Sequence, residues 1–222
     1  MSPRRLLVLL CPAVAAALLS CVDIGAPSRS NAYEWRRIVS TPTGLDTLSF
    51  HWPQSRLPVR IWADDTLNLP AHVQHGIDEW EAAFLYGEFR AVVVSDSSVA
   101  DVIVTSGLAP NGGFSVTRLE SFTAPECQGA TDIELAASGS EILPPIRVYV
   151  DPRFDPSSPG LDACIVLTTT HELGHALGIF AHSTNPNDIM YFDPVATTLS
   201  PADRATAEVA YHAEPTLTIA PR

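Results

Sequence analysis

The sequence predicts an α+β fold for a single domain that spans residues 46–222. Short segments rich in apolar and β-branched residues favour strands, and two longer segments favour helices. A third helix, with a clear start signal, lies near the end of the chain. About 200 residues follow the export signal described below, which is the length of one ordinary domain.

Strands are expected where short apolar runs end at proline, glycine or acidic residues. The clearest are Leu-Pro-Val-Arg-Ile-Trp at 57–62 and the run at 146–150, which ends at Asp151-Pro152. Further strands are expected at 89–94, 101–105, 114–119 and 131–136, although the signals between 107 and 145 are mixed.

Three helices are expected. Segment 70–86 places one set of apolar residues at helical spacing, so that face should pack on the core: Val73, Ile77, Trp80, Ala83 and Phe84. Its histidines, His72 and His75, are expected to be solvated. A second helix covers 161–177. The last opens at Ser200, with proline at its first position and Asp203 where a capping-box acid sits, and runs to about His212.

The first 20 residues are typical of an export signal. Arg4 and Arg5 precede an apolar run that is shorter than the roughly 20 residues of a membrane-spanning helix. The run ends Leu-Leu-Ser-Cys, which resembles a bacterial lipidation site. Cys21 is therefore expected to be lipidated and to anchor the protein in the cell envelope. The alternative is an ordinary cleaved signal peptide, in which Cys21 has no role and the protein is released outside the cell. Residues 21–45 lack periodicity and are expected to form a tether.

The composition is acidic. Loss of Arg4 and Arg5 with the signal takes the formal charge from −12 to −14, and the chain has no lysine. An acidic surface without a basic stripe argues against nucleic acid and anionic lipid surfaces as partners. We expect a monomer that touches the membrane only through its N-terminal lipid.

Cys127 and Cys164 remain once Cys11 and Cys21 are assigned to the signal. In an exported protein an even pair is most simply a disulfide. The alternative is a metal or redox role for Cys164. Cys164 lies two helical turns before His171, however, which places it about 10 Å from that histidine. A zinc ion bound to His171 could not reach it.

The most informative motif is His-Glu-Leu-Gly-His at 171–175. Histidines four residues apart on a helix lie one turn above each other, so His171 and His175 can bind one metal ion. Glu172 can reach a water on that ion and take its proton. Gly178 lets the chain turn out of the helix and bring His182 round as a third ligand. Three protein ligands plus a water are the pattern of a catalytic zinc site.

This motif, continued by Ser183, Asn185, Pro186 and Met190, resembles that of the metzincin zinc peptidases, and most closely the matrixins, the group of the matrix metalloproteinases. Met190, the only methionine besides Met1, falls where the family places its Met-turn. The departure concerns the third histidine, because the family position is Ala181 and His182 follows one residue later. The family spacing returns after His182, which indicates a bulged turn.

The resemblance implies a fold and a set of ligands. An upper subdomain, to about residue 182, would hold a twisted mixed sheet of about five strands and two long helices. A lower subdomain over 183–213 would hold the Met-turn and the final helix. The substrate would pair with the sheet edge, which the sequence does not locate between 107 and 137. Calcium is common in the family, and three acids are candidate ligands: Asp151, Asp155 and Asp162.

The function expected from these features is zinc-dependent endopeptidase activity on protein or peptide substrates. Zinc would polarise the scissile carbonyl, and Glu172 would act first as base and then as acid. Two alternatives stay open. One is a zinc-binding surface lipoprotein for adhesion or scaffolding, although such a protein has no use for Glu172. The other is an amidase that acts on cell-wall peptides.

Overall fold

The computed structural model describes residues 31–41, 44–110, 116–119, 127–155 and 157–221. The expected export signal, Cys21 and the first part of the expected tether lie outside this range. None of the helices within it is long and apolar enough to span a bilayer.

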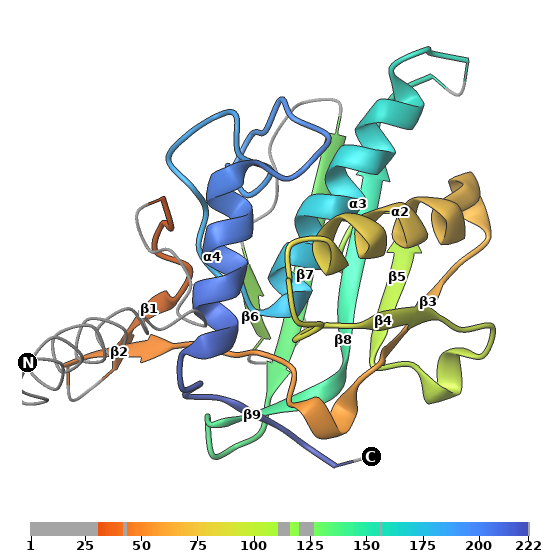
Figure 1. Ribbon diagram of the computed structural model, residues 1–222. Coiled ribbons are helices and arrows are strands. Elements are labelled where there is room, and N and C mark those ends of the chain that lie inside the picture. Colours follow the sequence, from red (N-terminus) through yellow and green to blue (C-terminus); the bar gives the residue numbers. More distant parts are fainter. Residues whose placement is uncertain (1–30, 42–43, 111–115, 120–126, 156, 222) are drawn as a thin grey trace, which may run out of the picture.

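A mixed sheet of seven strands forms the centre of the domain (Figure 1). Its strands are β3 (Val59–Ala63), β4 (Ala91–Val93), β5 (Val102–Ser106), β6 (Val116–Leu119), β7 (Cys127–Leu135), β8 (Glu141–Pro152) and β9 (Thr218–Ile219). The order is β4-β3-β5-β8-β7-β6, and β9 pairs with β8. Strands β3, β4, β5 and β8 are parallel, whereas β7 is antiparallel to β8 and β6. The expected mixed sheet is confirmed.

In this sheet, two strands are longer than the sequence predicts, and one was not predicted. β7 begins at Cys127 instead of 131, and β8 begins at Glu141 instead of 146. Pro144 and Pro145 concealed the first half of β8, because proline inside an apolar run argues against a strand. They lie beside an irregularity in the ladder, where the register of β7 against β8 shifts between Asp132 and Glu134. The unpredicted strand is the two-residue β9.

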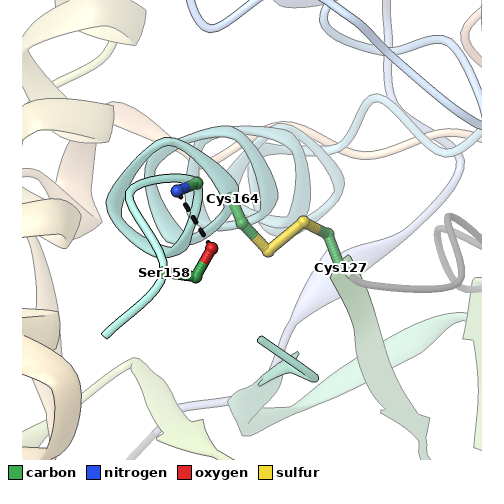
Figure 2. Close-up of a disulfide and its surroundings, with 4 residues drawn as sticks. Cys127, Ser158 and Cys164 are labelled. Atoms are coloured by element: carbon green, nitrogen blue, oxygen red, sulfur yellow. Dashed lines mark hydrogen bonds between the residues drawn. A yellow bond between two sulfur atoms is a disulfide. The ribbon is translucent and has the colours of Figure 1, made fainter. Parts of the chain in front are cut away.

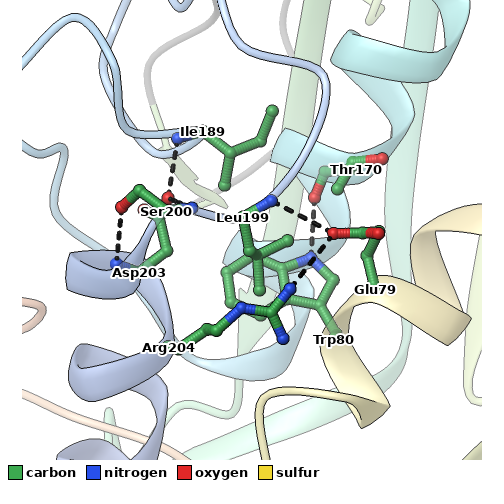
Figure 3. Close-up of polar contacts among 8 residues, drawn as sticks. All are labelled: Glu79, Trp80, Thr170, Ile189, Leu199, Ser200, Asp203 and Arg204. Carbon is green, nitrogen blue, oxygen red and sulfur yellow. Dashed lines mark hydrogen bonds and ion pairs between the residues drawn. The ribbon is translucent and has the colours of Figure 1, made fainter.

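Two long helices lie on the same face of the sheet and contact each other (Figure 1). They are α2 (Leu69–Glu81) and α3 (Leu161–Leu177), and α3 has the predicted bounds. The indole N–H of Trp80 in α2 donates to the carbonyl of Thr170 in α3 at 2.8 Å (Figure 3). This bond ties the two helices together one residue before His171.

The expectation that His72 is solvated is wrong. Its side chain is buried where α2 meets α3, and Nε2 lies 3.4 Å from a carboxylate oxygen of Asp162. Sequence spacing did not reveal that this part of α2 faces another helix. His75 is half-buried.

The last helix, α4 (Pro201–His212), begins with the predicted capping box. The Ser200 hydroxyl accepts from the N–H of Asp203, and the Asp203 carboxylate accepts from the N–H of Ser200. Short 3₁₀ turns η2 (Gln54–Arg56), η3 (Thr66–Asn68) and η4 (Ser97–Val99) complete the helical elements.

The chain before β3 is more than a tether. It contains a separate antiparallel hairpin of β1 (Arg37–Thr41) and β2 (Gly44–Leu48). Ahead of the hairpin, the Tyr33 hydroxyl donates to Asp203 at 2.7 Å, and Tyr33 and Trp35 pack against the core. The aromatic side chains of this segment bury apolar surface when it packs on the domain. A polar linker has no such surface, so nothing favours its packing.

Candidate metal centre

The last two turns of α3 carry His171, Glu172 and His175, all fully buried. The helix ends there because Gly178 adopts a left-handed conformation with φ 113°. An added Cβ at Gly178 would also collide with the carbonyl oxygen of Phe50. Only glycine suits both the turn and the close approach.

The structure brings His182 to the two helical histidines. One ring nitrogen from each of His171, His175 and His182 lies within 4.8 Å of the others. The Nε2 atoms of His175 and His182 are 3.2 Å apart. Two nitrogens that bind the same tetrahedral zinc at about 2.0–2.1 Å are separated by about 3.3 Å. The spacing of His175 and His182 therefore fits a zinc ion, and His171 lies close enough to complete a group of three that could hold a metal.

The other ring nitrogen of each helical histidine meets a backbone carbonyl. Nδ1 of His171 lies 2.7 Å from the oxygen of Ile189, and Nδ1 of His175 lies 2.6 Å from that of Ile179. A carbonyl only accepts, so Nδ1 carries the proton and Nε2 keeps its lone pair for a metal. Burial and the nearby His182 lower the pKa of His171 to about 3, and burial lowers the pKa of His175 well below its usual value. Both are neutral near pH 7, as metal ligands must be.

The turn between Gly178 and His182 holds the extra residue in a defined way. The N–H of Ile179 donates back to Gly174 at 3.0 Å, and the N–H groups of Phe180 and Ala181 both donate to the carbonyl of Trp35. Their donor–acceptor distances are 2.7 and 2.9 Å. The turn that brings His182 to the other two histidines thus uses an acceptor from the N-terminal segment.

Met190 is fully buried against α3. Its sulfur fills the space that a Cβ on Gly174, the residue before His175, would need. The adjoining backbone is held by the cap of α4, because Asp203 accepts from the N–H of Ile189 at 2.8 Å (Figure 3). It also accepts from the N–H of Met190 at 3.4 Å. The helix cap thus supports the loop whose carbonyl orients His171.

Glu172 follows His171 on α3, and its two carboxylate oxygens lie in different environments. The hydroxyl of Thr131, on β7, donates to Oε2 at 2.7 Å. Oε1 is buried and has no hydrogen-bond partner within the described chain. Burial raises the pKa of Glu172 to about 8. A buried oxygen without a partner fits a site completed by a metal and water, in which Oε1 can accept a proton.

The predicted disulfide between Cys127 and Cys164 is present (Figure 2). It joins the first residue of β7 to the first turn of α3, with 5.6 Å between the two Cα atoms. Cys164 is therefore committed to a structural bond, and the alternative of a metal or redox group is excluded. A disulfide indicates an oxidising compartment outside the cytoplasm.

The three aspartates named as candidate calcium ligands do not form a group that could hold a metal. Within the described ranges, the histidine trio is the only group of three or more such residues that could hold a metal. Each acid has another partner: Asp151 faces Arg153, Asp155 accepts from Ser157, and Asp162 faces His72. The structure gives no support to that calcium site.

Sequence reasoning missed three residues that support the centre. Thr131 contacts Glu172 from a strand, and Tyr33 and Trp35 reach the site from a segment taken for a linker. No local pattern marks them, since each is separated from its partner by 40 residues or more.

Comparison with known families finds no family model that matches this chain, and no curated protein matches it either. The arguments below therefore stand on the geometry of the site and on the motif.

Proposed function

We propose that this protein is an exported zinc-dependent endopeptidase with a metzincin catalytic domain similar to those of the matrixins. The observation that carries the proposal is the trio of His171, His175 and His182 beside the buried carboxylate of Glu172. Three nitrogen ligands leave one tetrahedral position open, which distinguishes catalytic from structural zinc sites.

Zinc held by the three histidines would supply a Lewis acid and lower the pKa of water to about 7. The chain's own contribution is Glu172. Oε1 takes a proton from the attacking water and returns it to the leaving amine, so that one group acts as base and then as acid. The carbonyls of Ile189 and Ile179 keep the rings of His171 and His175 oriented throughout.

The substrate is proposed to bind as an extended strand along β7. This strand contacts Glu172 through Thr131, so its edge lies next to the chemistry. β6 pairs with residues 131–134 of that edge. Residues 127–130 pair with β8 in the described ladders, and we propose that the peptide backbone adds to β7 close to Thr131.

The test compares the wild type with Glu172→Gln on casein and gelatin, with and without a chelator. Loss of the general base should lower hydrolysis by about 10²-fold or more. Zinc content should stay near one per chain, because Glu172 approaches the water and not the metal. Equal activity in the two proteins would refute the mechanism.

The same assay separates the alternatives. Zinc near one per chain with no cleavage of proteins or peptides would favour an adhesion or scaffold lipoprotein. Cleavage of cell-wall peptides alone would favour the amidase. A matched pair of variants tests the ligands: His182→Ala should lose zinc, whereas His75→Ala, which lies outside the trio, should keep it.

A lipid anchor at Cys21 is proposed for the N-terminus. The wild type should partition into a detergent phase, and Cys21→Ala should stay in the aqueous phase. Detergent partitioning by the variant would show that another feature holds the protein at the membrane.

A further inference from the structure

The face of β7 that meets Glu172 is formed by Gly129 and Thr131. Residues two apart on a strand point to the same side of the sheet. Both residues are buried, and their ladder partners on β8 are Val150 and Val148. Glu172 therefore lies against one residue without a side chain and one with a hydroxyl.

Gly129 provides the room for Glu172. A Cβ at this position would lie 2.5 Å from Oε1 and 2.7 Å from Cγ of Glu172, and 2.6 Å from Cγ2 of Thr168. These distances are well inside van der Waals contact. The carboxylate can occupy its place only because β7 has a glycine there.

Thr131 provides the hydrogen bond. Its hydroxyl has one proton and two candidate acceptors on Glu172, Oε2 at 2.7 Å and the backbone carbonyl at 3.1 Å. The carboxylate is the closer acceptor, and ionised acceptors form the stronger bonds. The bond occupies Oε2 and leaves Oε1, which has no partner in the described chain, for the reaction.

We propose that Thr131 is a positioning residue for the general base: its hydroxyl holds Oε2 of Glu172 so that Oε1 points at the reacting water. This inference rests on the proposed peptidase function. A free glutamate side chain has several rotamers, and the bond from Thr131 selects one before the substrate arrives.

The test uses three isosteric or conservative variants. Thr131→Val keeps the shape and removes the hydroxyl, whereas Thr131→Ser keeps the hydroxyl. The control is Thr169→Val, because Thr169 is equally buried on α3 but its hydroxyl has no partner in the described chain. Zinc content, kcat and KM are measured for each, and crystal structures are determined for the wild type and the Thr131 variants.

Thr131→Val should lower kcat by about 10- to 100-fold, with KM within about twofold and zinc content unchanged. Thr131→Ser should restore kcat to within about threefold of the wild type, and Thr169→Val should match the wild type. In the Thr131→Val crystal, the Glu172 carboxylate should leave its wild-type position.

Two results would overturn the inference. One is equal loss of kcat in Thr131→Ser and Thr131→Val, since that would make the hydroxyl irrelevant. The other is an unmoved Glu172 carboxylate in the Thr131→Val crystal. If the wild type cleaves no peptide, the peptidase proposal fails. The crystallographic position of Glu172 then decides by itself whether Thr131 holds it.

Discussion

The backbone carbonyl of Trp35 accepts a hydrogen bond from the N–H of Ala181 at 2.9 Å. Ala181 occupies the place of the third histidine in the matrixin motif that this sequence resembles, and this bond holds the turn that precedes His182. The neighbouring Phe180 donates to the same carbonyl. A segment more than 140 residues away in sequence thereby shapes the loop that delivers His182.

Removal of that segment should weaken zinc binding. A chain that starts at Arg37 lacks the Trp35 acceptor, and the buried N–H groups of the turn lose their partner. We expect zinc affinity to fall by about 10- to 100-fold, the usual range when support of a ligand is lost. Competition with a chromogenic chelator measures it. A chain that starts at Asn31 is the control, and equal affinity of the two would contradict the role of Trp35.

The hydroxyl of Tyr33 should stabilise the fold through Asp203. This buried carboxylate accepts from Tyr33 and from the backbone of Ile189, and burial and Asp203 raise the pKa of Tyr33 well above its usual value. Tyr33→Phe should lower the free energy of unfolding by about 1–3 kcal/mol, measured in urea. Tyr86→Phe is the control, since Tyr86 is 69% exposed and should change stability by less than about 0.5 kcal/mol.

The elements that the sequence predicted best have local signals at their ends. Ser200, Pro201 and Asp203 form a capping box, and Gly178 ends α3 at the predicted residue. The histidine ligands are also local, because helix geometry and one turn bring them together. The start of β8 was not predictable, because Pro144 and Pro145 interrupt the pattern where the ladder itself is irregular.

The support of the site could not be predicted from one sequence. Gly129 and Thr131 alternate on a strand, and nothing local says which face of that strand meets α3. The sequence did not reveal that Tyr33 and Trp35, which fall in the expected tether, contact the domain, because their partners lie in α4 and in the turn after Gly178. Long-range pairings of this kind depend on the assembled fold.

Gly129→Ala should disturb both stability and catalysis. The new methyl group would overlap Glu172 and Thr168, and overpacking of this kind costs about 1–3 kcal/mol of unfolding free energy. Displacement of Glu172 should also lower kcat. Gly160→Ala is the matched control, because its nearest contact is the ring of Phe154 at 3.1 Å, which has room to shift. Wild-type stability and kcat in Gly129→Ala would refute the close approach.

The disulfide should contribute strongly to stability. It joins residues 37 positions apart, and closing a loop of that length restricts the unfolded chain by about 3–4 kcal/mol. The double variant Cys127→Ser/Cys164→Ser should lose that amount relative to the oxidised wild type in urea unfolding. The wild type unfolded in urea with a reductant present should show the same loss of unfolding free energy. Equal urea midpoints in the oxidised wild type and the double variant would contradict a stabilising role of the disulfide.

The buried carboxyl of Glu172 should make metal-free protein less stable as pH rises. Burial raises the pKa of Glu172 in the folded protein to about 8, whereas its ordinary value is 4.5. Between these two values the unfolded chain ionises and the folded chain does not, so the folded state binds more protons and the free energy of unfolding falls with increasing pH. Glu172→Gln removes this titration and leaves His171 and His175 in place, so their opposite dependence cancels when the two proteins are compared.

The stability difference between Glu172→Gln and the wild type should therefore shift by about 3 kcal/mol in favour of the variant from pH 5 to pH 7.5. Urea unfolding of the metal-free proteins across this range measures it. Added zinc should reduce the shift, because a nearby cation favours the ionised carboxylate. A difference that stays constant with pH would mean that Glu172 is ionised in the folded, metal-free protein, and that burial does not hold its proton.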